Sequence, residues 1–142
     1  MEVIVRRFRI ELLGYPKHTT SILFIFSDGV PTDGDPLPIA EELKDSGVYI
    51  VSCFLTNQNI TRPRKLFQKA DPQWPQGAKL MFAMASSVNQ NSIFVESLLE
   101  KGWEVPNMPK LFVQANHPDL LNEFTQIIVS LCKGADWTSG GI

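Results

Sequence analysis

The 142-residue chain lacks several features that define whole classes of protein. Its two cysteines, Cys53 and Cys132, are too few to build a disulfide framework. No apolar run approaches the roughly 18–20 residues that a membrane-spanning helix requires. Basic residues do not outnumber acidic ones, with 13 Lys and Arg against 15 Asp and Glu, so no net positive charge attracts nucleic acid or an anionic membrane. The sequence therefore predicts no nucleic-acid partner and no membrane insertion.

What remains is the composition of one ordinary globular domain. Hydrophobic residues make up 44% of the chain and charged residues 20%, which is typical of a packed protein. The first residues carry their charge after a very short apolar run, unlike a secretory signal, so we expect an intracellular, cytoplasmic protein. We divide the chain into an N-terminal segment (1–20), a folded domain (21–134) and a loose tail (135–142).

Apolar runs alternate with amphipathic stretches, a pattern that predicts an α/β fold. Residues 21–26 are apolar without polar alternation, which is typical of a strand buried on both faces of a parallel sheet. Residues 48–55 and 111–115 predict two more strands. We expect a Rossmann-like, partly doubly wound and mostly parallel sheet of three to four strands with flanking helices.

The helices are predicted from apolar spacing and from the residues that end them. The last one is the clearest, because six apolar side chains between Leu120 and Leu131 fall on one face and Pro118 suits the first helical position. We expect further helices between Pro36 and the stop at Gly47, over 78–85 and over 93–101, with one or two helical turns over 63–70.

The N-terminal segment is consistent with two structures. As a strand, Val3–Ile10 would cover the sheet edge beside residues 21–26 or pair with a second copy of the chain. Apolar side chains at i, i+3 and i+7 fit a helix equally well. Both interpretations stay open at this point.

Short motifs after the first strand resemble a known family. Phe-Ser-Asp-Gly stands at 26–29 and Pro-Thr-Asp-Gly at 31–34. A helix, the strand Tyr-Ile-Val-Ser-Cys-Phe at 49–54 and a final helix ending in Leu-Cys-Lys at 131–133 follow. This order resembles the second half of a von Willebrand factor A domain over residues 21–134. The resemblance implies a protein-binding function, with a metal-ion-dependent adhesion site at the carboxyl ends of the strands.

The resemblance assigns Asp28 to that metal site. The family completes the site with an Asp-x-Ser-x-Ser loop and a threonine from a second loop, whose oxygens suit Mg²⁺. This chain contains no Asp-x-Ser-x-Ser, and one carboxylate alone binds Mg²⁺ weakly. We therefore expect an incomplete site with weak Mg²⁺ binding and no certain cofactor. The alternative is that Asp28 is a turn residue that needs no metal.

Three further residues are candidates for contact with a protein partner, namely Asp33, Asp35 and Trp74. The two aspartates lie in the turn-rich loop after the first strand, where the alternative role is to form the turn and start the helix. Trp74 lies between Pro72 and Pro75 and is either an exposed recognition residue or a plug over the core.

Charge is spread unevenly along the chain. Residues 28–45 hold six acids and one base, whereas residues 62–79 hold five bases and one acid. These runs indicate either two solvated faces or an acidic rim at a cation site and a basic patch for an acidic partner.

Two residues with reactive side chains have plain structural interpretations. His117 directly precedes Pro118 and is interpreted as a helix cap or surface residue. Cys53 lies within a predicted strand and is interpreted as an inert core thiol, with a bridge to Cys132 left open.

Three functions fit these observations. We expect a non-catalytic protein-binding module. One alternative is an Mg²⁺-dependent phosphohydrolase-like enzyme that uses Asp28, although Asp28-Gly29 departs from the Asp-x-Asp-Gly-Thr pattern of such enzymes and no Ser–His–Asp or Cys–His set accompanies it. The other is a self-associating fragment that forms a homo-oligomer through an exposed sheet edge at residues 21–26.

Overall fold

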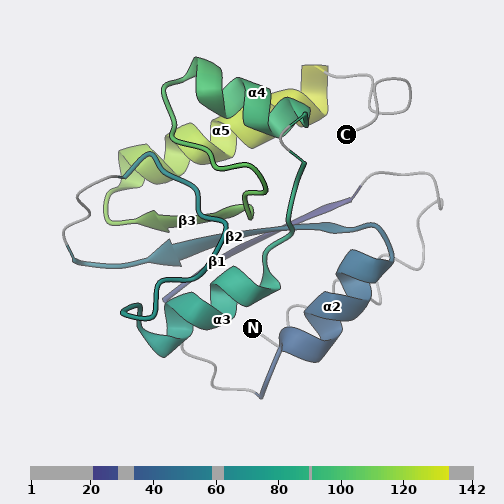
Figure 1. The fold of residues 1–142 in the computed structure, drawn as a ribbon, viewed down its shortest axis with the longest axis vertical. Helices are drawn as coiled ribbons and strands as arrows, with labels where there is room; N and C mark the ends of the chain where they lie inside the picture. The colour runs from purple at the N-terminus through teal and green to yellow at the C-terminus, as the bar shows by residue number, and fades with distance from the viewer. Residues whose placement is uncertain (1–20, 29–33, 59–62, 90, 135–142) are drawn as a thin grey trace.

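A computed structural model describes residues 21–28, 34–58, 63–89 and 91–134 of the chain. Their helices and strands form three layers, with α4 and α5 on one side of the sheet and α2 and α3 on the other (Figure 1). In chain order the elements are β1 (Ile22–Ser27), α2 (Leu37–Asp45), β2 (Tyr49–Leu55), α3 (Gln76–Met84), α4 (Ile93–Glu100), β3 (Phe112–Ala115) and α5 (Pro118–Gly134).

The sheet has three parallel strands in the order β1-β2-β3. Ile22 of β1 lies opposite Tyr49 of β2, and Ser52 of β2 lies opposite Phe112 of β3. The predicted α/β fold with a parallel sheet is therefore confirmed. The proposed fourth strand, Val3–Ile10, lies outside the described residues.

Both faces of the sheet are covered by helices, which explains the continuous apolar runs. Ile50 and Phe54 of β2 pack in the cluster formed with α2 and α3, and Val51 and Cys53 pack in the cluster formed with α4 and α5. This alternation buries β2 on both sides, as the absence of polar alternation predicted.

Coverage is less complete at β1, the strand at the end of the described sheet. Leu23 and Ile25 are buried beneath α2 and α3. On the opposite face Ile22 and Phe24 are only half-buried, and Phe26 is 46% exposed. The Phe24 and Phe26 rings stack with centroids 6.1 Å apart. An apolar stripe therefore runs along this face of β1.

Helix α2 begins and ends as its sequence predicts. The Asp35 carboxylate accepts a hydrogen bond from the Leu37 backbone N–H at 3.1 Å, which satisfies one of the free donors of the first turn. Gly47 has a φ of +93°, a left-handed conformation that favours glycine, and it turns the chain into β2. Asp35 thus acts at the start of the helix.

The expected helical turns over 63–70 are wrong. In their place an isolated parallel bridge joins Lys65 to Glu104. The Leu66 N–H donates to the Glu104 carbonyl at 2.9 Å, and the Glu104 N–H donates to the Arg64 carbonyl at 2.9 Å. Because Leu66 is fully buried in the cluster with α4 and α5, pairing with a distant segment prevails over a local turn.

Candidate binding surface at the carboxyl edge of the sheet

The three parallel strands end at the same edge, and a pocket of about 480 Å³ opens there. We name it the carboxyl-edge pocket. Each strand contributes the residues that directly follow or complete it. The lining consists of Asp28, Leu55, Thr56, Asn57, Ala115, Asn116, His117, Pro118 and Leu121.

The lining combines apolar and polar side chains. Leu55 is 40% exposed and Leu121 is half-buried, so the pocket offers apolar surface to a ligand. Asp28, Asn57 and Asn116 are exposed and supply a carboxylate and two amides. None of the described lining residues is Lys or Arg.

Local hydrogen bonds hold the strand ends together. The Thr56 N–H donates to the Ala115 carbonyl at 3.1 Å and so extends the pairing of β2 with β3 by one residue. The Thr56 hydroxyl accepts from the Gln58 N–H at 3.2 Å, which fixes the chain as it leaves the strand. The backbone beneath the pocket is thus ordered before any partner arrives.

His117 caps α5, as its position before Pro118 predicted. Its Nδ1 accepts a hydrogen bond from the Asp119 N–H at 3.1 Å. The same Nδ1 lies 3.5 Å from the Asp119 carboxylate. The imidazole is exposed at the pocket, but its Nδ1 is engaged in holding the first turn of the helix.

The structure brings one of the predicted site residues to this pocket, namely Asp28. Asp35 is exposed at the start of α2, and Asp33 lies outside the described residues. Within the described ranges, no group of three or more His, Cys, Asp or Glu side chains is placed to hold a metal ion. Among the described residues, Asp28 is therefore not a member of a cluster of metal ligands.

Trp74 packs over the core. Its ring centroid lies 4.9 Å from that of Phe67, 5.5 Å from that of Phe82 and 5.2 Å from that of Phe112. Three aromatic contacts account for a half-buried indole without a partner protein. Of the two interpretations, the plug over the core is the one that this packing favours.

Cys53 is a buried free thiol in β2. Burial raises the pKa of this thiol to about 12. Because the thiolate is the nucleophile, a thiol with so high a pKa is inert at neutral pH. The predicted core position of Cys53 is confirmed, and its inertness stays a prediction.

Leu55, Thr56, Asn57 and Asn116 were not singled out in the sequence. The signal that could have found them is their position directly at or after two predicted strands. Carboxyl ends of parallel strands meet at one edge, so these residues had to lie near Asp28. Their ordinary chemistry, one leucine among amides and a hydroxyl, gave no motif.

None of the helices in the described part of the chain is long and apolar enough to cross a membrane. Comparison with family models, curated proteins and solved structures gives no match for this chain. The resemblance to a von Willebrand factor A domain therefore stays a prediction, carried by the motifs alone.

Proposed function

We propose that the chain is a non-catalytic protein-binding module, and that its partner binds at the carboxyl-edge pocket. The observation that carries the proposal is the joint position of exposed Leu55 and exposed polar side chains at the ends of all three parallel strands. In open α/β sheets this edge is where ligands bind. An apolar contact ringed by hydrogen-bonding groups is also the usual composition of a protein interface.

Two features favour binding over catalysis. The pocket's described lining contains one carboxylate and one imidazole, and the imidazole Nδ1 is occupied by the cap of α5. The Cys53 thiol is buried within the sheet, with its pKa raised by burial. Turnover of aryl phosphates that disappears in Asp28→Asn would instead support the phosphohydrolase alternative.

The resemblance to the second half of a von Willebrand factor A domain agrees with this proposal. In this interpretation Asp28 belongs to an incomplete adhesion site, and binding does not depend on a tightly held metal. The partner then contacts the protein side chains of the pocket directly. Any Mg²⁺ at this site is bound weakly and exchanges with solvent.

The test is site-specific photo-cross-linking in an extract of cells that express the chain. A photoreactive residue replaces Asn57 or Asn116, and the control replaces Ser46, an exposed residue just before β2 at the opposite edge of the sheet. We expect a shared adduct from the two carboxyl-edge positions and none from Ser46.

Affinity measurements with the purified partner then test whether it binds at the carboxyl-edge pocket. We expect Leu55→Ser to weaken its binding at least tenfold in calorimetry. The matched control, Leu99→Ser on α4, removes an even more exposed leucine, at 54%, and should leave affinity unchanged. Equal losses in the two variants, or adducts from Ser46 alone, would reject the carboxyl edge as the binding surface.

Self-association through β1 is a second candidate function. Among the described strands, β1 pairs only with β2, and Ile22–Ser27 contains no charged residue or proline of the kind that protects natural sheet edges. Phe26 is 46% exposed on this strand.

The geometry of a β1 pair is restricted. A two-fold axis between two β1 strands gives an antiparallel pair, and facing residues in such a pair lie on the same side of the sheet. If Phe24 faces its own copy, Phe26 faces Ile22 of the other chain, and the half-buried apolar stripe becomes continuous. The result joins the three described strands of each copy into one continuous sheet.

A further inference from the structure

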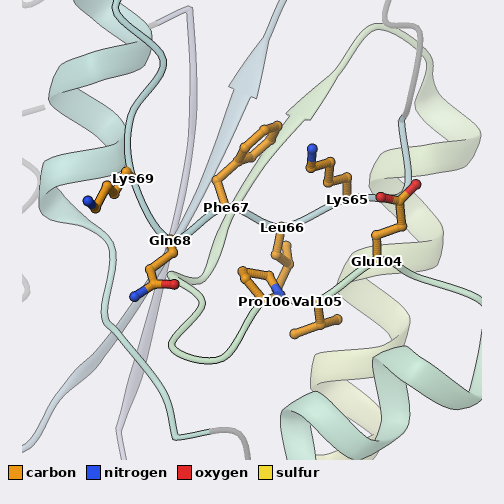
Figure 2. A pocket seen from close by; sticks show the side chains of 8 residues that line it. All are labelled: Lys65, Leu66, Phe67, Gln68, Lys69, Glu104, Val105 and Pro106. Carbon is orange, nitrogen blue, oxygen red and sulfur yellow. The ribbon is translucent and has the colours of Figure 1, made fainter.

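A second pocket, of about 500 Å³, lies between two segments outside the helices and strands (Figure 2). One wall is formed by Lys65–Lys69 and the other by Glu104–Pro106. We name it the loop pocket. None of its residues lines the carboxyl-edge pocket.

The walls of the loop pocket are held by backbone hydrogen bonds and by buried side chains. The two bonds between Glu104 and the 64–66 segment join the walls directly. The Lys110 N–H donates to the Phe67 carbonyl at 3.0 Å, and the buried Leu66 anchors the first wall in the core. Binding to such a surface requires little ordering of the chain, which favours affinity.

The charged groups in the described lining of the loop pocket are two lysines and one glutamate. Figure 2 shows the ammonium groups of Lys65 and Lys69 on opposite sides of Phe67, with the Glu104 carboxylate on the side of Lys65. The Lys65 Nζ lies 5.1 Å from the centroid of the Phe67 ring. An incoming anion therefore meets least competition at Lys69.

The neighbouring Arg64 does not add a free cation. Its Nε donates to the Glu123 carboxylate of α5 at 2.7 Å. The apolar part of the lining comes from Leu66, Phe67, Val105 and Pro106. The loop pocket thus presents an apolar surface with lysines at its borders.

We propose that the loop pocket binds an acidic segment of a partner protein, with carboxylates at Lys65 and Lys69 and an apolar side chain against Val105 and Pro106. The described lining holds Lys65 and Lys69 against Glu104, so its net charge is positive and matches such a ligand. A nucleic acid is a poorer fit, because the chain carries a net charge of −2 and a long polyanion meets its acidic surfaces as well.

The test uses a fluorescein-labelled octapeptide of alternating glutamate and leucine, and a control peptide with glutamine in place of glutamate. Fluorescence anisotropy with the full chain should show the glutamate peptide binding at least tenfold more tightly. Backbone amide signals should shift at 65–69 and 104–106 in NMR spectra. Equal binding of the two peptides, or shifts confined to other residues, would overturn the proposal.

Charge-reversal variants separate the site from general electrostatics. Lys69→Glu should lower the affinity for the glutamate peptide at least fivefold. Lys101→Glu, at an exposed lysine after α4, should change that affinity by less than twofold. Equal losses in both variants would reject the loop pocket as the site. An oligonucleotide of equal charge that binds as tightly, with the same dependence on Lys69, would reject the acidic-protein ligand.

Peptide binding at the loop pocket should not depend on the carboxyl-edge pocket. Leu55→Ser should leave the affinity for the glutamate peptide unchanged, because Leu55 lines the carboxyl-edge pocket and is not among the lining residues of the loop pocket.

Discussion

The carboxyl-edge pocket and the loop pocket are built in different ways, and their described linings carry different charge. The carboxyl-edge pocket consists of the ends of three parallel strands and the start of a helix, and its described lining contains a carboxylate and no Lys or Arg. The loop pocket consists of two paired loops and contains Lys65 and Lys69. The same small fold can therefore present two surfaces with different chemical preferences.

The largest expected effect is on stability, and it compares a buried leucine of the loop pocket with an exposed leucine of the carboxyl-edge pocket. Leu66→Ala should lower the free energy of unfolding by about 3 kcal/mol, because the leucine is fully buried and its loss leaves a cavity. Leu55→Ala, at a leucine that is 40% exposed, should cost less than about 1 kcal/mol. Urea unfolding of the two variants measures both values. Equal costs would contradict the contrast between a core-anchored pocket and an open strand edge.

A smaller effect concerns the apolar stripe on β1, which neither pocket uses. If two copies pair through β1, Phe26→Ser should weaken self-association about tenfold, because it removes an aromatic contact from each half of the interface. Light scattering over a range of concentrations measures the dimerisation constant. The control is Met108→Ser, which removes a comparably exposed apolar side chain, at 47%, from a loop. A chain that is monomeric at all concentrations would exclude this pairing.

Lys110 and Lys69 differ in burial, because Lys110 is half-buried whereas Lys69 of the loop pocket is exposed. Its Nζ donates to the Ala83 carbonyl at 3.2 Å, and burial, with nearby Lys44, lowers its pKa from 10.5 to about 8. Between these two values the unfolded chain holds more protons than the folded one, so this group makes stability rise with pH. We expect Lys110→Met to reduce that rise in pH-dependent urea unfolding.

The control for this pH dependence is Lys69→Met. It should retain the rise in stability between pH 8 and 10.5 that Lys110→Met reduces. Identical pH profiles for both variants and the parent chain would show that folding does not perturb Lys110.

The smallest expected effect is metal binding at the carboxyl edge. Titration with Mn²⁺ should show only weak, millimolar-range affinity, because the described residues place Asp28 in no cluster of metal ligands. Calorimetry on the parent chain and on Asp28→Ala checks this. A micromolar affinity that Asp28→Ala abolishes would mean that other groups complete the site.

The difference between the pockets also explains what could be predicted from the sequence. No end of a strand differs from its predicted position by more than one residue. The strands could be located because burial on both faces of the sheet requires a continuous apolar run. The resemblance to a von Willebrand factor A domain assigned Asp28 to the carboxyl edge, and Asp28 lines the carboxyl-edge pocket. A helix start was one of two interpretations of His117 and the alternative role of Asp35, both drawn from local patterns, and their hydrogen bonds are local.

The loop pocket could not be predicted in this way. Its walls are about forty residues apart in sequence and meet through one short bridge between Lys65 and Glu104. No periodic pattern in 63–70 specifies that pairing, so local spacing suggested helical turns instead. Trp74 illustrates the same limit, because its contact with Phe112 depends on the folded sheet.

The most direct test of the central claim is hydrogen exchange of the chain with and without the partner that cross-links at Asn57. The account predicts slower exchange in the partner complex at Leu55–Asn57 and at Asn116–His117, with little change at Ser46–Tyr49 on the opposite edge. Protection confined to the opposite edge, or none at the carboxyl edge, would contradict the assignment of the carboxyl-edge pocket as the binding surface.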